Sequence, residues 1–260
     1  MESCNLAKLL ADRMLSQPSA RAKAMNILIT AGNTQAMIDR VRCITNIFSG
    51  RTGAGIAAEA IRRGHRVTLL TSHPESVSES DGISVLPYRA YEELASLMKT
   101  RLTGESWDAV IHTAAVSDYL AAGVYEADAN FQKDGENLKC DGKVTMHSRS
   151  AGKVKSGSVE LWLRLVRAPK LIDRIRGEWR FRGVLVKFKL EVEVTDEELL
   201  AVAERSRLLS DADLMVANTL EGAAEWAYLG EGEYSRVTRA ELPARLIDAV
   251  ERISTVDGAR

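Results

Sequence analysis

Short apolar runs alternate with longer amphipathic segments along most of this chain. The first run, NILIT at residues 26–30, is rich in β-branched residues and ends at the polar sequence AGN. Runs of this length and composition predict buried strands. By the same pattern, further strands are predicted at residues 66–72, 82–88, 107–119, 158–166, 183–194 and 213–220.

Apolar residues at helical spacing predict helices between these strands. The predicted helices lie at residues 52–64, 91–102, 168–176, 195–209 and 238–254. Gly64 is placed to end the first helix, and Thr195 with Glu198 forms a capping box at the start of another. Thr238 and Glu241 form a second such box. Strands and helices in this alternation predict an α/β fold with a Rossmann-like, doubly wound, mostly parallel sheet.

Residues 120–157 interrupt the alternation. This segment is polar and glycine-rich and has no sustained hydrophobic period. A long stretch without regular structure inside a compact domain is usually functional or disordered. We therefore expect one Rossmann-like domain at residues 25–260, with an insertion at residues 120–157 that the family resemblance described below implies is a flap or dimerisation insertion. Residues 1–24 are expected to be an extension, disordered or a short helix, and Met25 is an alternative start.

The composition narrows the function classes. The formal net charge of the 260 residues is −1, which argues against general binding to nucleic acid or to anionic membranes. Cys4, Cys43 and Cys140 are widely spaced and indicate neither a disulfide framework nor a metal cluster, so a cytoplasmic location is expected. No apolar run approaches the roughly 20 residues needed to span a bilayer.

In a Rossmann fold, glycines follow the first strand directly, whereas in this chain they lie much further along the sequence. Gly50, Gly53 and Gly55 still precede the first helix, where their backbone N–H groups can meet a phosphate. No acidic residue ends the second strand to bind a ribose, so the pattern fits a triphosphate or another anion at least as well as NAD. A purely structural alternative is that the glycines only permit close packing of the helix on the sheet.

An inserted segment, QAMIDRVRCITNIFSG, lies between the first predicted strand and the first predicted helix. It carries Arg42, Asn46 and Ser49, and Arg51 follows it directly. This concentration of polar residues beside an anion-binding helix start is typical of a substrate pocket. Each residue alone would more often be a solvated charge or a turn residue.

Five blocks along the chain resemble, in order, the phosphopantothenate–cysteine ligase family. They are ILITAGNTQAMIDRVRCITNIFSGRTGAGIA, AAVSDY, GKVKSG, VLVKFKLE and ADLMVANTL. The resemblance is to the stand-alone form, without the flavin-binding decarboxylase domain. It implies that CTP or ATP, with Mg²⁺, activates the carboxylate of 4′-phosphopantothenate as an acyl nucleotidylate, which the amine of cysteine then attacks. It also implies a cytoplasmic homodimer without flavin, with the flap near the interface.

The resemblance assigns roles residue by residue. It implies that Asn46 and Lys153 are catalytic, and that Arg42 and Asn46 bind phosphopantothenate. The residues it places around the nucleotide are Gly32, Ser49, Gly50, Arg51, Gly53, Asp118, Lys153, Phe188 and Asn218. It assigns no metal ligand.

The chain departs from the family pattern at several positions. Asn33 stands where glycine is usual, although asparagine tolerates positive φ better than most residues. Phe48 replaces a small hydroxyl residue beside the phosphates, and Ala168 replaces a polar residue. Arg205 and Leu209 stand where bacterial members often carry two lysines, so one cation on the phosphate side is kept and one is lost.

Two other functions remain open from the sequence. The first is a diverged protein of the same fold that binds a nucleotide without turnover, which the Phe48 and Leu209 departures favour. The second is a short-chain NAD(P)-dependent oxidoreductase, suggested by TGAGIA alone. That class needs a Tyr-x-x-x-Lys pair, which the sequence does not contain.

Overall fold

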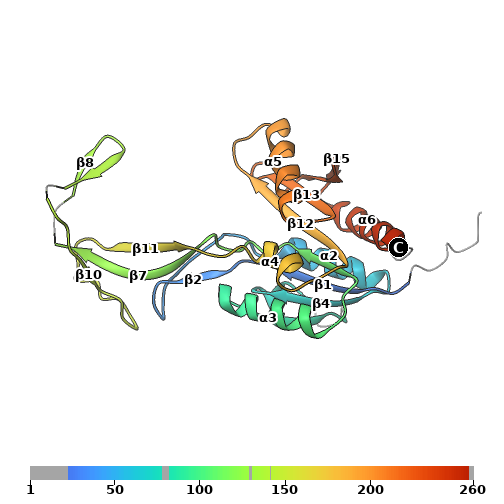
Figure 1. Cartoon of the computed structure of the whole chain (residues 1–260), viewed down its shortest axis with the longest axis horizontal. Coiled ribbons are helices and arrows are strands. Elements are labelled where there is room, and N and C mark those ends of the chain that lie inside the picture. The colour runs from blue at the N-terminus through green and yellow to red at the C-terminus, as the bar shows by residue number, and fades with distance from the viewer. Residues whose placement is uncertain (1–22, 78–81, 129–130, 141, 258–260) are drawn as a thin grey trace, which may run out of the picture.

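The computed structural model describes residues 23–77, 82–128, 131–140 and 142–257. Most of the predicted N-terminal extension, residues 1–22, lies outside them. The core is an eight-stranded sheet with the order β15-β14-β13-β12-β6-β1-β4-β5 (Figure 1). From one end of this core two thin structures project (Figure 1).

The six strands of the sheet from β13 to β5 are parallel. They are β1 (Asn26–Ala31), β4 (Arg66–Thr71), β5 (Ser84–Pro87), β6 (Ala109–His112), β12 (Val184–Glu191) and β13 (Leu214–Thr219). At one edge, β14 (Trp226–Glu231) and β15 (Glu233–Thr238) continue the sheet as an antiparallel hairpin. The parallel strands match the prediction, whereas the edge hairpin was not predicted.

Helices cover both faces of the sheet, so the prediction of a doubly wound sheet is confirmed. Alternate residues of β1 enter different cores: Ile27 and Ile29 pack with α2 (Arg51–Arg62) and α6 (Leu242–Asp257). Leu28, between them, packs with α3 (Tyr91–Gly104) and α4 (Leu171–Gly177). The α5 helix (Asp196–Leu209) lies on the same face as α4, against alternate residues of β13. A short 3₁₀ turn, η1 (Pro74–Ser76), follows β4.

Both predicted capping boxes form. Thr195 accepts a hydrogen bond from the backbone of Glu198, and the Glu198 carboxylate accepts one from the Thr195 backbone at 2.9 Å. Thr238 and Glu241 exchange the same pair of bonds, at 3.1 and 3.3 Å. Here the helix, α6, begins only at Leu242, four residues later than predicted.

The expectation that residues 120–157 lack regular structure is wrong. They contain most of an antiparallel arm made of β7 (Tyr119–Ala127), β10 (Met146–Ser148) and β11 (Trp162–Arg167), with a hairpin of β8 (Gln132–Asp134) and β9 (Asn137–Lys139). Figure 1 shows the arm extending away from the core. The period is missing because few positions of the arm strands are buried, so no alternation of core and surface residues marks them.

The inserted segment after β1 forms a second projection. It is a hairpin of β2 (Gln35–Met37) and β3 (Cys43–Thr45), and we call residues 35–45 the finger. The finger lies beside the arm (Figure 1), and the backbone N–H of Arg40 donates to the carbonyl of Gly152 at 3.1 Å. In the described part of the chain, no helix is long and apolar enough to cross a membrane.

Candidate functional site

A cavity of about 770 Å³ opens at the carboxyl ends of the parallel strands. Its walls are the start of α2, the ends of β12 and β13, and the connection from β15 to α6. The predicted site residues that line it are Gly32, Ser49, Gly50, Arg51, Phe188 and Asn218. The structure therefore gathers six of the predicted nucleotide-side residues around one space.

The first turn of α2 faces this cavity without a capping side chain. Gly50 is the N-cap residue and has a φ of 74°, and its carbonyl accepts a hydrogen bond from Ala54 at 3.1 Å. No acidic residue lies in the first turn. The first N–H groups of a helix have no partner within it, and the helix dipole adds partial positive charge there. This end of α2 can therefore bind an anion.

Two of the glycines are required by close contacts between loops. Gly32 has a φ of 87°, and a side chain there would overlap the hydroxyl of Ser72. A Cβ on Gly50 would lie 2.9 Å from the backbone nitrogen of Gly32. Gly53 does not line the cavity: a Cβ there would lie 2.5 Å from the Cβ of Ala31, so Gly53 brings α2 against β1.

Asn33 works through its side chain, not through an unusual backbone conformation. The residue with positive φ is the preceding Gly32, and Asn33 is not among the non-glycine residues that have one. The Asn33 amide donates to the carbonyl of Asn46 at 2.7 Å and to that of Phe48 at 3.0 Å. These bonds hold the loop before α2 against the end of β1, and Phe48 lines the cavity.

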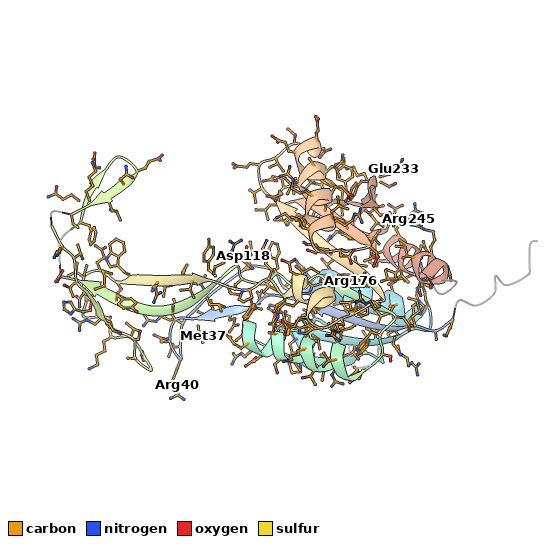
Figure 2. All side chains as sticks on the ribbon, in the orientation of Figure 1. Met37, Arg40, Asp118, Arg176, Glu233 and Arg245 are labelled. Atoms are coloured by element: carbon orange, nitrogen blue, oxygen red, sulfur yellow. The ribbon has the colours of Figure 1, made fainter. Side chains whose placement is uncertain are left out.

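Asn46 lies at the edge of the cavity and Asp118 lies away from it. The Asn46 amide donates to the carbonyl of Ala115, a residue that lines the cavity, at 3.0 Å. Asp118 is exposed and directly precedes the arm strand β7. Figure 2 shows it where the arm leaves the core. Neither side chain is part of the cavity wall.

Arg42 and Lys153 lie together at a separate place, where the finger meets the arm. Asp39, on the finger, is the centre of this contact: its carboxylate accepts hydrogen bonds from the Arg42 guanidinium at 2.6 and 3.0 Å and from the Val154 backbone at 3.0 Å. Arg42 also donates to the Val154 carbonyl at 2.8 Å. The Arg42 guanidinium holds the pKa of Asp39 well below its usual range. Lys153, beside this contact, is exposed.

The two positions expected to hold lysines on the phosphate side lie elsewhere. Arg205 and Leu209 belong to α5, which packs on Met215 of β13. The cavity borders α2 and α6, which pack on the opposite face, where Val216 points. Leu209 is 78% exposed and does not line the cavity, so the loss of a phosphate-side cation at this position stays a prediction.

Four polar residues that line the cavity were not predicted from the sequence: Thr52, Thr113, Lys189 and Arg239. Lys189 follows Phe188 directly and pairs with Glu191 at 2.9 Å. Arg239 lies between Thr238 and Glu241, which form the second capping box. The polar residues of this stretch could therefore be explained by helix capping alone, without a role in the cavity. The unpredicted β14–β15 hairpin brings Arg239 to the cavity.

Two basic side chains on the parallel strands have lowered pKa values, and neither lines the cavity. His112 ends β6 and contacts the Thr30 hydroxyl through Nδ1 at 2.8 Å, and burial lowers its pKa to about 4. Lys187, on β12, donates to the Ser206 carbonyl at 2.8 Å and to the Ser210 hydroxyl at 2.5 Å. Burial lowers the pKa of Lys187 to about 8. His112 is therefore neutral at pH 7.

Comparison with a protein-family model and comparison with curated proteins agree on the family. Residues 22–141 match the DNA/pantothenate metabolism flavoprotein C-terminal domain. The coenzyme A biosynthesis bifunctional protein CoaBC of Thermococcus kodakarensis is 33% identical over 237 residues, which are 87% of this chain and 51% of that protein. The chain thus spans about half the length of the curated CoaBC relatives it matches.

Solved structures give the same result. The DNA/pantothenate metabolism flavoprotein of Streptococcus pneumoniae is 27% identical, with a TM-score of 0.72 over 88% of this chain and 99% of that one. A Cab2 variant in complex with phosphopantothenate-cysteine has the same fold, at 17% identity and a TM-score of 0.62 over 98% of this chain and 94% of that one. The chain therefore belongs to the CoaBC family, and residues 22–141 match its DNA/pantothenate metabolism flavoprotein C-terminal domain model.

Proposed function

We propose that this protein joins 4′-phosphopantothenate to cysteine in coenzyme A biosynthesis, at the expense of CTP or ATP. The observation that carries the proposal is the cavity at the uncapped start of α2, in a chain that corresponds to part of CoaBC. Among the described residues that line it, Arg51, Lys189 and Arg239 are cationic and none is acidic. A cavity of this charge suits a polyanion such as a nucleoside triphosphate.

The proposed reaction has two steps. A carboxylate oxygen of phosphopantothenate attacks the α-phosphorus of the nucleotide, and the bond to the bridging oxygen breaks, so that pyrophosphate leaves with the electron pair. The cysteine amine then attacks the acyl carbon, loses a proton, and displaces the nucleoside monophosphate. Negative charge accumulates on the leaving phosphates in both steps, where helix N–H groups and cationic side chains stabilise it.

The cavity wall suggests how the nucleotide lies. Phe188 offers the ring against which a base can stack, and Asn218, at the end of β13, offers amide hydrogen bonds. Ser49 and Gly50 would then contact the phosphates at the start of α2. The side-chain oxygens of the wall include no carboxylate among the described residues, so we expect Mg²⁺ to be held by the nucleotide phosphates.

Arg42 would act on the phosphopantothenate side, and Lys153, expected to be catalytic and to contact the nucleotide, lies beside it. They lie at the contact of finger and arm, outside the cavity wall, so the substrate has to bridge the two places or a second subunit has to bring them together. Asn46, bonded to Ala115, lies between β3 and the cavity and is our candidate to bind the acyl intermediate.

We propose that the protein is a homodimer formed through the arm. Its strands leave large apolar side chains exposed: Tyr119, Leu138, Met146 and Leu165. An isolated three-stranded sheet with apolar groups in water gains stability when a second copy covers them. Sedimentation of the wild-type protein and of a Leu165→Asp variant tests this: the wild type should be dimeric and the variant should dissociate, whereas a wild-type monomer would refute it.

The test of the function is pyrophosphate release with Mg²⁺, CTP or ATP, and 4′-phosphopantothenate, with and without cysteine. We expect release that depends on phosphopantothenate. Asn46→Asp should abolish product or let the acyl nucleotidylate accumulate, without change in folding, and Lys153→Ala should impair turnover much more than stability. Folded wild-type protein that releases no pyrophosphate with either nucleotide would contradict the proposal.

One specific observation favours the alternative function, nucleotide binding without turnover. Phe48 lines the cavity beside Ser49 and Gly50, where a bulky ring takes space from the phosphates. A protein that binds the nucleotide but does not turn it over would fit this. Saturable nucleotide binding without pyrophosphate release identifies that case.

A further inference from the structure

The cavity has a second cationic wall that the sequence did not reveal. It is formed by the connection between β15 and α6, which follows the unpredicted edge hairpin. Arg239 is the charged residue of this wall, and Ala240, Leu242 and Pro243 are its other members. The Arg239 backbone N–H donates to the Glu225 carbonyl at 2.7 Å, which fixes the start of the connection.

Arg239 reaches from this wall to the first turn of α2. Its guanidinium donates to the hydroxyl of Thr52, which lies two residues after the N-cap Gly50. This bond uses one of the five N–H donors that a guanidinium carries. In the described chain, no other hydrogen bond of the Arg239 side chain is formed. The remaining donors are therefore available to a ligand beside the start of α2.

Arg239, unlike three other arginines that are largely removed from solvent, has no carboxylate partner within the described ranges. Three arginine side chains that are only 13 to 18% exposed each form an ion pair: Arg63 with Asp248, Arg176 with Asp213, and Arg207 with Glu204. Arg239 is half-buried and forms no such pair there. Burial lowers the pKa of Arg239 from its usual range, whereas ion pairing raises the pKa of Arg207.

Taking a charge partly out of water without a counter-charge is costly, and a ligand of opposite charge offsets that cost. Such a ligand must be negative and must lie beside both Arg239 and the uncapped turn of α2. We infer that Arg239 binds the phosphate chain of the nucleotide together with the α2 N-terminus. It thereby acts as a binding residue for the triphosphate and for the pyrophosphate that leaves. The identity of this ligand rests on the proposed function.

This role of Arg239 predicts which part of the nucleotide the side chain recognises. Because its free donors lie at the phosphate end, it should contribute to the affinity for phosphates and not to the affinity for the base or ribose. Planar guanidinium donors match two phosphate oxygens, so lysine at this position should restore only part of the affinity.

Isothermal titration with inorganic tripolyphosphate, CTP, ATP and the two phosphate-free nucleosides tests the inference at one fixed ionic strength. Arg239→Gln should lower the affinity for tripolyphosphate and for both nucleotides by about tenfold to a hundredfold, as expected for a lost charge-assisted hydrogen bond. Affinity for the nucleosides should not change. Arg239→Lys should fall between the wild type and Arg239→Gln.

Arg245→Gln is the matched control. It removes the same charge from α6 (Figure 2), six residues further along the chain. Arg245 does not line the cavity. Binding by this variant should equal that of the wild type. Equal loss of tripolyphosphate binding in both variants would reduce the effect to net charge and overturn the inference.

Thermal unfolding separates a binding role from a structural one. Without ligand, Arg239→Gln should be as stable as the wild type or slightly more stable, since a half-buried charge without a counter-charge is removed. Tripolyphosphate should raise the melting temperature of the wild type much more than that of the variant. A variant that is destabilised without ligand, yet gains as much as the wild type from tripolyphosphate, would show that Arg239 only supports Thr52.

This test is independent of the ligase reaction. Tripolyphosphate binding that depends on Arg239, in a protein that releases no pyrophosphate, would leave the inference intact and refute the proposed function. Pyrophosphate release with unchanged phosphate affinity in Arg239→Gln would do the opposite.

Discussion

Alanine at Gly53 should be clearly less stable than alanine at Gly55, although both residues lie in the first half of α2. A Cβ on Gly53 would lie 2.5 Å from the Ala31 Cβ and 2.9 Å from the Thr113 hydroxyl oxygen. Both distances are below normal van der Waals contact. A Cβ on Gly55 would meet only Pro243, at 3.9 Å, an ordinary contact.

The magnitude follows from two opposing contributions. Replacing glycine by alanine inside a helix stabilises by about 1 kcal/mol, and this contribution is similar at both positions. Overpacking costs typically about 1 to 3 kcal/mol, and it applies only at Gly53. Gly53→Ala should therefore be less stable than Gly55→Ala by about 1 to 3 kcal/mol in the free energy of unfolding. In a domain of this size that corresponds to a melting temperature lower by roughly 2 to 12 °C.

Urea unfolding followed by circular dichroism measures this difference. Gly55→Ala should match or exceed the wild-type stability, and Gly53→Ala should lie below Gly55→Ala with an unchanged denaturant slope. Equal stability of the two variants would refute the reasoning that Gly53 is needed for packing. In that case the contribution of Gly53 would have to come from the nucleotide, and its alanine variant should lose affinity instead.

Two further predictions follow. Asp39→Asn should leave the unfolding midpoint of the core nearly unchanged. It should speed hydrogen exchange at the Val154 amide by about tenfold or more, because the carboxylate that joins Arg42 to Val154 is lost. Hydrogen exchange measured by mass spectrometry tests this, and unchanged protection of Val154 would contradict it. The pKa of buried His112 is lowered to about 4, so the unfolded chain takes up a proton below about pH 6.5 while the folded protein does not. Stability should thus fall as the pH falls, by about 2 kcal/mol between pH 7 and pH 5 from His112 alone. His112→Gln should lack that part of the loss in urea titrations at the two pH values, and an identical pH dependence in variant and wild type would contradict it.

The core elements are the part of the fold that the sequence predicts. The β1 strand and α2 follow from composition and period, and the box at Thr195 and Glu198 marks the start of α5 to the residue. These signals are local, because each element buries a defined face. The β14–β15 hairpin contains charged and polar residues at many positions and lies at a sheet edge, so neither burial nor turn chemistry identified it.

The candidate site also contains some residues whose positions the sequence predicts and others whose positions it does not predict. Ser49, Gly50 and Phe188 could be predicted to share a place because parallel strands and the first helix end at one edge of the sheet. The position of Arg42 could not, because it depends on how the finger packs on the arm, through Asp39. Arg239 depends on a hairpin that the sequence did not predict. In both cases long-range packing, which leaves no periodic signal, decides where the side chain lies.

The arm also affects how the sheet can form. The β6 and β12 strands are neighbours in the middle of the sheet, with Ala109 opposite Val184, yet all of the arm lies between them in the chain. Bringing these two strands together therefore closes a loop of roughly 70 residues, and the entropic cost of such a closure grows only with the logarithm of loop length. Even doubling the length of this whole loop would cost the core only about 0.6 kcal/mol. The outer parts of the arm can therefore be lengthened, shortened or exchanged during evolution without endangering the sheet that holds the cavity.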